Sequence, residues 1–191
     1  MNFLTKNIKA LEFTQSGLTQ AMKERLELNR ALRFVKDNDN ILDALLKVRI
    51  YQNPNLEVEE KIKYFDENFP KYPVLFIFGL GNARLIHHLL KNTKHKRIIV
   101  FEPEFELVYY GLENFDFAKD IKAGRLVILD VSNLNGSTFS ALFSLAYMGA
   151  NLKVYNLNSS CEYYEKFYEQ DMQSVHNACV LGIFTQFARC G

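Results

Sequence analysis

The hydrophobic and polar positions of the first 70 residues predict a small helix-rich segment with short strands. Over residues 2–30 the apolar side chains recur at helical intervals between charged and amide side chains. The next twenty residues favour short strands or a hairpin around the polar turn Asp37-Asn38-Asp39-Asn40. A helix then follows, and we expect Asn55 to cap it and Pro70 to mark its end.

From residue 71 onward, apolar runs typical of strands alternate with segments of helical spacing. Val74–Phe78 is a run of five apolar residues, which is typical of a strand buried on both faces. Further strands are predicted at Arg97–Phe101, Arg125–Leu129 and Leu152–Leu157. Helices are predicted after Asn82, at Phe105–Phe115 and Ser137–Met148, and over Ser160–Arg189 as one long helix or a pair. This alternation predicts a Rossmann-like, mostly parallel α/β sheet with helices on both faces over residues 71–191, preceded by a helix-rich α+β segment over residues 1–70.

The first predicted strand is followed by the glycine turn Gly79-Leu80-Gly81-Asn82 and then by a helix. Glycine permits the positive φ of a tight turn and lets a ligand approach the backbone. A helix that starts just after such a turn offers free N–H groups to an anion. The third glycine of the dinucleotide-binding pattern is replaced, because Ala83 and Arg84 follow instead.

Two acidic residues end the next two strands, and they complete a candidate nucleotide site. Glu102 lies 23 residues after Gly79, close to the roughly 20 residues at which an acidic side chain meets a ribose hydroxyl. Asp130 ends the third strand at the same edge of the sheet. In such a site Gly79 and Gly81 would admit the ligand, Glu102 would accept from a ribose, and Asp130 would contact an adenine or a sugar. The alternative is that both acids cap the helices that follow their strands.

Composition narrows the class of partner. The formal charge is +1, from 23 basic and 22 acidic residues, so no overall field attracts nucleic acid or an anionic membrane. No apolar stretch is long enough to span a membrane, and the amino terminus does not resemble a signal peptide. The three cysteines are odd in number and widely spaced. We therefore expect a cytoplasmic protein with reduced thiols. The four histidines have no partners at ligand spacing, so no metal site is predicted.

Several segments taken together resemble the amino-terminal region of the motility-associated factor (Maf) proteins. They are the helical first segment, Tyr-Gln-Asn-Pro at Tyr51 to Pro54, the strand and turn F-I-F-G-L-G-N, F-E-P-E after the second strand, and the strand R-L-V-I-L. Proteins of this family are bacterial flagellin glycosyltransferases, which move a nonulosonic acid such as pseudaminic or legionaminic acid from a CMP-activated donor to Ser or Thr of flagellin. The G-x-G-P-S-L type sequence that marks the family's catalytic part does not occur in this chain.

The resemblance implies a non-catalytic Rossmann-like domain, with flagellin and the remaining catalytic domain of the enzyme as partners, and a role in flagellar motility. No catalytic residue can be assigned to this chain. The nucleotide would be a CMP-sugar in the full-length enzyme. The alternative is a nucleotide-binding enzyme resembling an S-adenosylmethionine-dependent methyltransferase, because the glycine turn and the acid at Glu102 also match the start of such a domain. Whether the apolar last helix mediates homo-oligomer formation or contacts a further domain is left open by the sequence.

Overall fold

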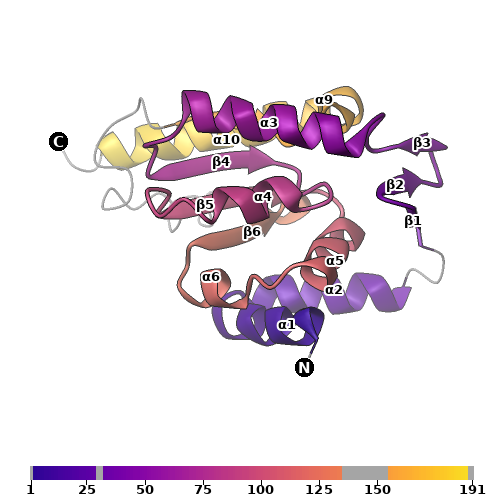
Figure 1. The fold of residues 1–191 in the computed structure, drawn as a ribbon. Coiled ribbons are helices and arrows are strands. Elements are labelled where there is room, and N and C mark those ends of the chain that lie inside the picture. The colour runs from indigo at the N-terminus through magenta and orange to yellow at the C-terminus, as the bar shows by residue number, and fades with distance from the viewer. Residues whose placement is uncertain (1, 29–31, 135–154, 189–191) are drawn as a thin grey trace.

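A four-stranded parallel sheet forms the centre of the computed structural model, which describes residues 2–28, 32–134 and 155–188 (Figure 1). Its strands are β4 (Val74–Phe78), β5 (Arg97–Glu102), β6 (Leu126–Asp130) and β7 (Leu157–Ser159). They are hydrogen-bonded in the order β6-β5-β4-β7, and every pair is parallel. The predicted Rossmann-like α/β fold is confirmed.

The sheet is buried on both faces because its central strands are apolar at every position. In β4, Phe76 and Phe78 pack into a core on one face, and Leu75 and Ile77 pack into a second core on the other. Helices cover both faces, with α3 and α4 in front of the sheet and α10 behind it in Figure 1. These helices are α3 (Pro54–Asn68), α4 (Arg84–Leu89), α5 (Phe105–Asn114), α6 (Ala118–Lys122), α9 (Glu162–Phe167) and α10 (Glu169–Ala188).

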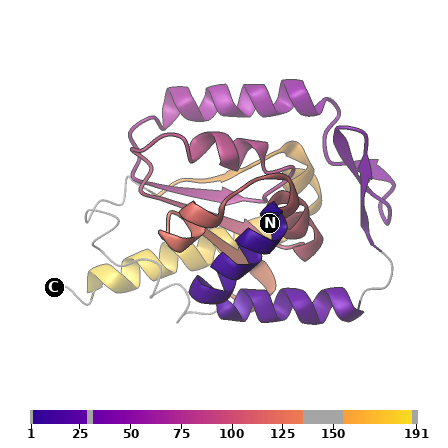
Figure 2. The same ribbon diagram turned by 60° about the horizontal axis from the view of Figure 1, so that its bottom comes forward.

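The first two helices lie against the far end of this sheet, below it in Figure 1 and in front of it in Figure 2. They are α1 (Phe3–Thr14) and α2 (Ser16–Leu28). The amide group of Asn7 is buried between α5 and α6, where its Nδ2 donates to the carbonyl oxygens of Leu112 and Phe115 and its Oδ1 accepts from the N–H of Phe117. Gln15 pairs with the outer edge of β6 by donating to the carbonyl of Ile128 and accepting from its N–H.

A small antiparallel sheet, β1-β2-β3, lies beside the carboxyl ends of the parallel strands (Figure 1). It contains β1 (Phe34–Asp37), β2 (Asn40–Asp43) and β3 (Val48–Arg49). The predicted hairpin is therefore confirmed, and its turn uses Asn38 at φ +56°, a left-handed conformation that asparagine tolerates better than most residues.

Three local predictions need correction or lie beyond the description. Asn53 caps α3 in place of Asn55, because Pro54 occupies the first helical position and the Asn53 side chain accepts from the N–H of Leu56. The last strand of the sheet is Leu157–Ser159, so Tyr155 and Asn156 of the predicted strand precede it. The remaining part of that predicted strand and the predicted helix Ser137–Met148 lie outside the described residues. A further short helix, α6, was not predicted.

Candidate functional site

The glycine turn leaves β4 at its carboxyl end, and three alternate residues of it have a positive φ angle. Gly79 has φ +86°, Gly81 has φ +56°, and Ala83 has φ +63° just before α4 begins. The N–H of Gly79 donates to the carbonyl of Phe101 on β5, at 2.7 Å, so the turn starts in register with its neighbour strand. The N–H groups of residues 80, 81 and 82 are then directed away from the sheet ladder.

Glu102 lies at the end of β5, directly beside this turn, and it is 1% exposed. Its carboxylate accepts from the N–H of Leu80 at 2.6 Å, from the N–H of Glu104 at 2.9 Å and from the hydroxyl of Tyr164 at 2.7 Å. A buried acidic group is tolerated only when its oxygens have hydrogen-bond donors, and here three donors surround it. Glu102 therefore fixes the position of the turn through its hydrogen bond with the N–H of Leu80.

Two tyrosines fill the space on the ligand side of the turn. A Cβ atom added to Gly79 would lie 2.1 Å from the ring of Tyr164, and a Cβ atom added to Gly81 would lie 2.2 Å from the hydroxyl oxygen of Tyr51. The hydroxyl of Tyr164 accepts from the N–H of Gly81 at 3.1 Å, and that of Tyr51 accepts from the N–H of Asn82 at 3.0 Å. The glycines at this turn thus admit tyrosine side chains of the protein itself.

The N–H groups that would hold a phosphate in a dinucleotide-binding fold all have acceptors within this protein. Leu80 donates to Glu102, Gly81 to Tyr164 and Asn82 to Tyr51. A nucleotide could use these groups only after both tyrosines had moved away. Nucleotide binding by Gly79, Gly81, Asn82, Glu102 and Asp130 stays a prediction, and in this arrangement the first four residues are engaged in internal packing.

Asn82 has an additional peculiarity. Its Oδ1 accepts from the N–H of Arg84, and this short side-chain link supports the start of α4. Its Nδ2 is buried and has no hydrogen-bond partner within the described ranges, and neither has the nearby hydroxyl of Ser160. The two tyrosines therefore cover the turn, although two buried polar atoms beside it have no hydrogen-bond partner in the described residues.

Asp130 ends β6 in register with Glu102, as expected from the sequence. Its side chain caps the 3-10 turn Val131–Asn133, where Oδ1 accepts from the N–H of Ser132 at 3.0 Å and from its hydroxyl at 2.7 Å. Asp130 therefore acts as a cap, as the alternative interpretation of the sequence predicted. Glu102 does so in part, because it also accepts from the N–H of Glu104 at the start of α5.

A network of charged groups and tyrosine hydroxyls lies beside the carboxyl end of β5. Arg33 donates to both oxygens of Asp43, at 3.0 and 2.6 Å, and to Glu104 at 2.6 Å. The hydroxyls of Tyr163 and Tyr168 donate to Asp43 and Glu104, each at 2.6 Å. Burial raises the pKa of Asp43, but the bonds from Arg33 and Tyr163 outweigh it and lower the pKa to about 2. These contacts join the β1-β2-β3 sheet to α9 and the end of β5.

Glu102 is expected to make stability fall as pH rises. Burial raises its pKa to about 8, although its three donors favour the carboxylate. In the unfolded chain the group ionises near pH 4.5, so between these values the folded state binds the extra proton and the free energy of unfolding declines with pH. Denaturant unfolding at intervals from pH 5 to 9 measures this slope. We expect Glu102→Gln to flatten it, and an unchanged slope would contradict the assignment to Glu102.

The sequence singled out the turn and the acids but missed the groups that cover them. Tyr51, Tyr164 and Arg33 lie 31, 83 and 71 residues from their partners Asn82, Gly81 and Glu104, and no local pattern reports a pairing over such distances. The available signal was the aromatic content of 14%, made entirely of Phe and Tyr.

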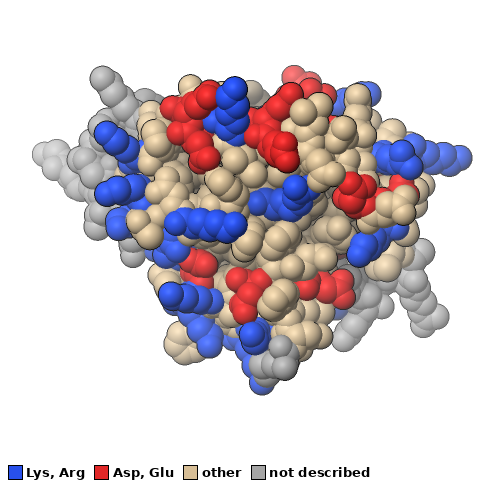
Figure 3. Space-filling model, viewed as in Figure 1, with Lys and Arg blue, Asp and Glu red and all other residues tan. Residues whose placement is uncertain are grey.

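Other chemistries find little support in the described ranges. No group of three or more His, Cys, Asp or Glu residues in these ranges could hold a metal ion. The helices of the same ranges include none that is both long enough and apolar enough to cross a membrane. In Figure 3 acidic side chains lie mainly along the upper margin, at the lower centre and at the right, and basic side chains gather toward the left.

Comparison with known proteins gives one informative likeness. No family model matches the chain, and no curated protein matches it. Among solved structures, the MAf glycosyltransferase from Magnetospirillum magneticum AMB-1 superposes with a TM-score of 0.54 and 15% sequence identity. The superposition covers 93% of this chain and 35% of that protein, so the chain spans about a third of the glycosyltransferase. At this identity the likeness extends to the fold.

Proposed function

We propose that this chain is the amino-terminal, non-catalytic Rossmann-like domain of a flagellin glycosyltransferase of the motility-associated factor kind. Transfer of a CMP-activated nonulosonic acid to Ser or Thr of flagellin would be carried out in the cytoplasm by a catalytic part outside these 191 residues. The fold likeness to a MAf glycosyltransferase over 93% of the chain supports the choice of enzyme class.

The observation that carries the non-catalytic assignment is the position of Tyr164. Its ring fills the space beside Gly79, and its hydroxyl links Glu102 to the N–H of Gly81. Displacing a fully buried tyrosine whose hydroxyl both donates and accepts a hydrogen bond is costly, because its two partners would lose those hydrogen bonds. The glycine turn therefore serves as a packing site for α9, and the domain acts by supporting the enzyme or positioning its acceptor.

Isothermal titration calorimetry of the folded chain tests the non-catalytic assignment. We expect no binding of S-adenosylmethionine, S-adenosylhomocysteine, NAD, CMP or a CMP-nonulosonic acid at concentrations up to about 1 mM, because the phosphate-binding and ribose-binding groups are engaged. Cooperative thermal unfolding of the same sample provides the control for folding. Micromolar binding of S-adenosylmethionine that Glu102→Gln weakens by about tenfold or more would replace the proposal with a methyltransferase-like enzyme.

A separate measurement tests the enzyme class. In the source organism, removal of residues 1–191 from the encoded protein is expected to leave flagellin without the added mass of a nonulosonic acid. Intact-mass spectrometry of purified flagellin measures this directly, and re-expression of the intact coding sequence provides the control. Flagellin of unchanged mass would contradict the proposed role in glycosylation.

A further inference from the structure

In the part of the chain that the structure describes, no strand pairs with the outer edge of β7. Its other edge pairs with β4. The N–H of Ser160 donates to the carbonyl of Phe78 at 2.9 Å, and in a parallel ladder successive residues direct their N–H and C=O groups to opposite sides. Asn158 and Ser160 thus face β4, whereas the main-chain groups of Leu157 and Ser159 face outward.

This edge opens into a groove between the helices that cover the two faces of the sheet. In Figure 1 the top of the sheet has α3 in front of it and α9 and α10 behind it. A cavity of about 460 Å³ lies between α3 and α9, and another of about 370 Å³ lies between α9 and α10. Leu157, Glu165 and Met172 line both cavities, so the two cavities adjoin at the start of β7 and together form the groove.

The walls of the groove are predominantly acidic. Its carboxylates are Glu57, Glu60, Glu162, Glu165 and Glu169. Lys61 is the single lysine or arginine that lines these two cavities, and its Nζ lies 3.4 Å from Glu165 and 3.5 Å from the hydroxyl of Ser159. Acidic side chains also gather along the upper margin of the molecule, over α3, with a basic side chain between them (Figure 3).

We propose that this groove binds an extended segment of a partner polypeptide that carries basic side chains and adds to the sheet beside β7. The outward groups of Leu157 and Ser159 supply main-chain hydrogen bonds, as in other cases of strand addition. Glu60 and Glu162 supply the charge that favours lysine or arginine on the added strand. Lys61 and Glu165 lie against Ser159, which is 2% exposed, so an added strand must displace them. Their ion pair is partly exposed to solvent, where such pairs are weak, so an incoming basic residue can replace Lys61.

The acidic walls disfavour pairing of this edge with a second copy of the chain. β7 is only three residues long, and two grooves of the same sign would repel one another. A basic segment has neither obstacle, which makes the surface selective for a partner of opposite charge. This inference depends on β7 and its flanking helices, and it stands independently of the proposed enzyme class.

Fluorescence anisotropy with a labelled peptide tests the proposal on the full chain. The probe is acetyl-Lys-Val-Lys-Thr-Lys-Val-Lys-amide, and the charge control replaces each lysine by glutamate. We expect saturable binding of the probe and at least about tenfold weaker binding of the glutamate peptide. Absence of binding by both peptides would overturn the proposal.

N-methylated forms of the probe separate strand pairing from simple attraction of charge. Methylation of every second main-chain nitrogen removes the donors on one edge and keeps the charge. We expect one of the two methylation registers to abolish binding and the other to retain it. Equal binding of both registers would show electrostatic attraction only and would overturn strand addition.

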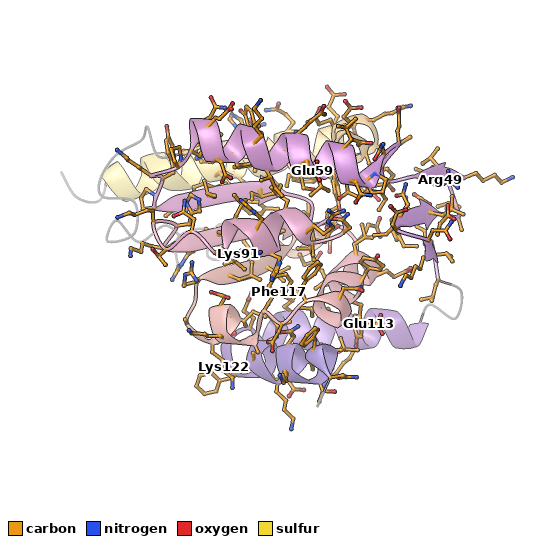
Figure 4. The ribbon with its side chains drawn as sticks, viewed as in Figure 1. Arg49, Glu59, Lys91, Glu113, Phe117 and Lys122 are labelled. Carbon is orange, nitrogen blue, oxygen red and sulfur yellow. The ribbon has the colours of Figure 1, made fainter. Side chains whose placement is uncertain are left out.

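Two pairs of charge reversals locate the surface. Glu60→Lys combined with Glu162→Lys is expected to weaken binding of the probe by about tenfold or more. Glu59→Lys combined with Glu113→Lys is the matched control, because these exposed residues lie outside both cavities, on α3 and α5 (Figure 4), and it should change affinity by less than about twofold. Equal effects of the two pairs would place the peptide elsewhere.

Hydrogen exchange gives a further readout at the strand itself. Binding should slow exchange at the amides of Leu157 and Ser159, which face outward, and leave those of Asn158 and Ser160 unchanged, because they already face β4. Uniform protection of all four amides, or none, would contradict the proposed register.

Discussion

Gly79→Ala is expected to destabilise the chain by about 3 kcal/mol or more. The new Cβ atom would lie 2.1 to 2.4 Å from three ring atoms of Tyr164, and φ at this position is +86°. Strained backbone costs about 1–3 kcal/mol and overpacking of a filled core costs about 1–3 kcal/mol, and the two add because the ring and the backbone are both fixed. Denaturant unfolding monitored by circular dichroism measures the loss.

A second glycine in the chain provides a matched control for this substitution. Gly17 lies near the start of α2, and a Cβ atom there would meet nothing within 4 Å. Gly17→Ala should therefore leave stability unchanged or raise it by up to about 1 kcal/mol, as expected from helix propensity. If both variants unfold at the same denaturant concentration, Tyr164 does not cover the turn.

A double-mutant cycle identifies the clash. Tyr164→Ala alone should cost about 3–5 kcal/mol, because a large buried ring is lost. In the double variant Gly79→Ala with Tyr164→Ala, the space for the new methyl group exists, so the summed cost of the two single changes should exceed the cost of the double change. Additive effects would mean that the strain at Gly79 comes from its backbone alone.

Arg33→Ala is expected to cost about 3 kcal/mol, because it leaves a buried carboxylate without its counter-charge. The Asp43 side chain is 0% exposed and that of Arg33 is 24% exposed. Loss of one partner of a buried pair costs about 3–5 kcal/mol, and the partial exposure of Arg33 favours the lower end. Arg49→Ala is the control, since Arg49 is largely exposed beside Asp37 (Figure 4) and exposed pairs contribute about 1 kcal/mol or less.

The same ion pair predicts a change in acid sensitivity. The pKa of Asp43 is lowered from 3.8 to about 2 in the folded state, so its stabilising effect is present above pH 3.8 and is lost as pH falls through 2. In Arg33→Ala the group should titrate at higher pH, and acid unfolding should begin earlier. An identical acid transition in both proteins would contradict the role of Arg33.

The fold was predictable because each main strand of the parallel sheet is a short run of apolar residues in the sequence. Val74–Phe78 has five apolar residues, and such a run has few alternatives to a strand buried on both faces. Even the turn and the acid at Glu102 could be placed, because both follow strands directly. The capping residue of α3 was harder, since Asn53 and Asn55 flank Pro54 on either side and only the proline's preference for the first helical position separates them.

The candidate site was less predictable because its state depends on contacts between distant segments. Gly79 and Gly81 read equally well as a ligand site or as a place where a side chain packs. In the structure Tyr164 fills this space, and the sequence of residues 79–82 does not indicate that a tyrosine 83 residues after Gly81 packs there. Patterns in sequence report which backbone conformations are allowed, whereas occupation of the resulting space is a tertiary property.

The buried amide of Asn7 sets an order for folding during synthesis. Its acceptors and donor lie at Leu112, Phe115 and Phe117, which are 105 to 110 residues later in the chain. At about 5–20 residues per second, the ribosome needs about 5–20 s to deliver them. Helix α1 thus cannot complete its packing until these later residues have been synthesised, and until then its apolar face stays uncovered by α5 and α6.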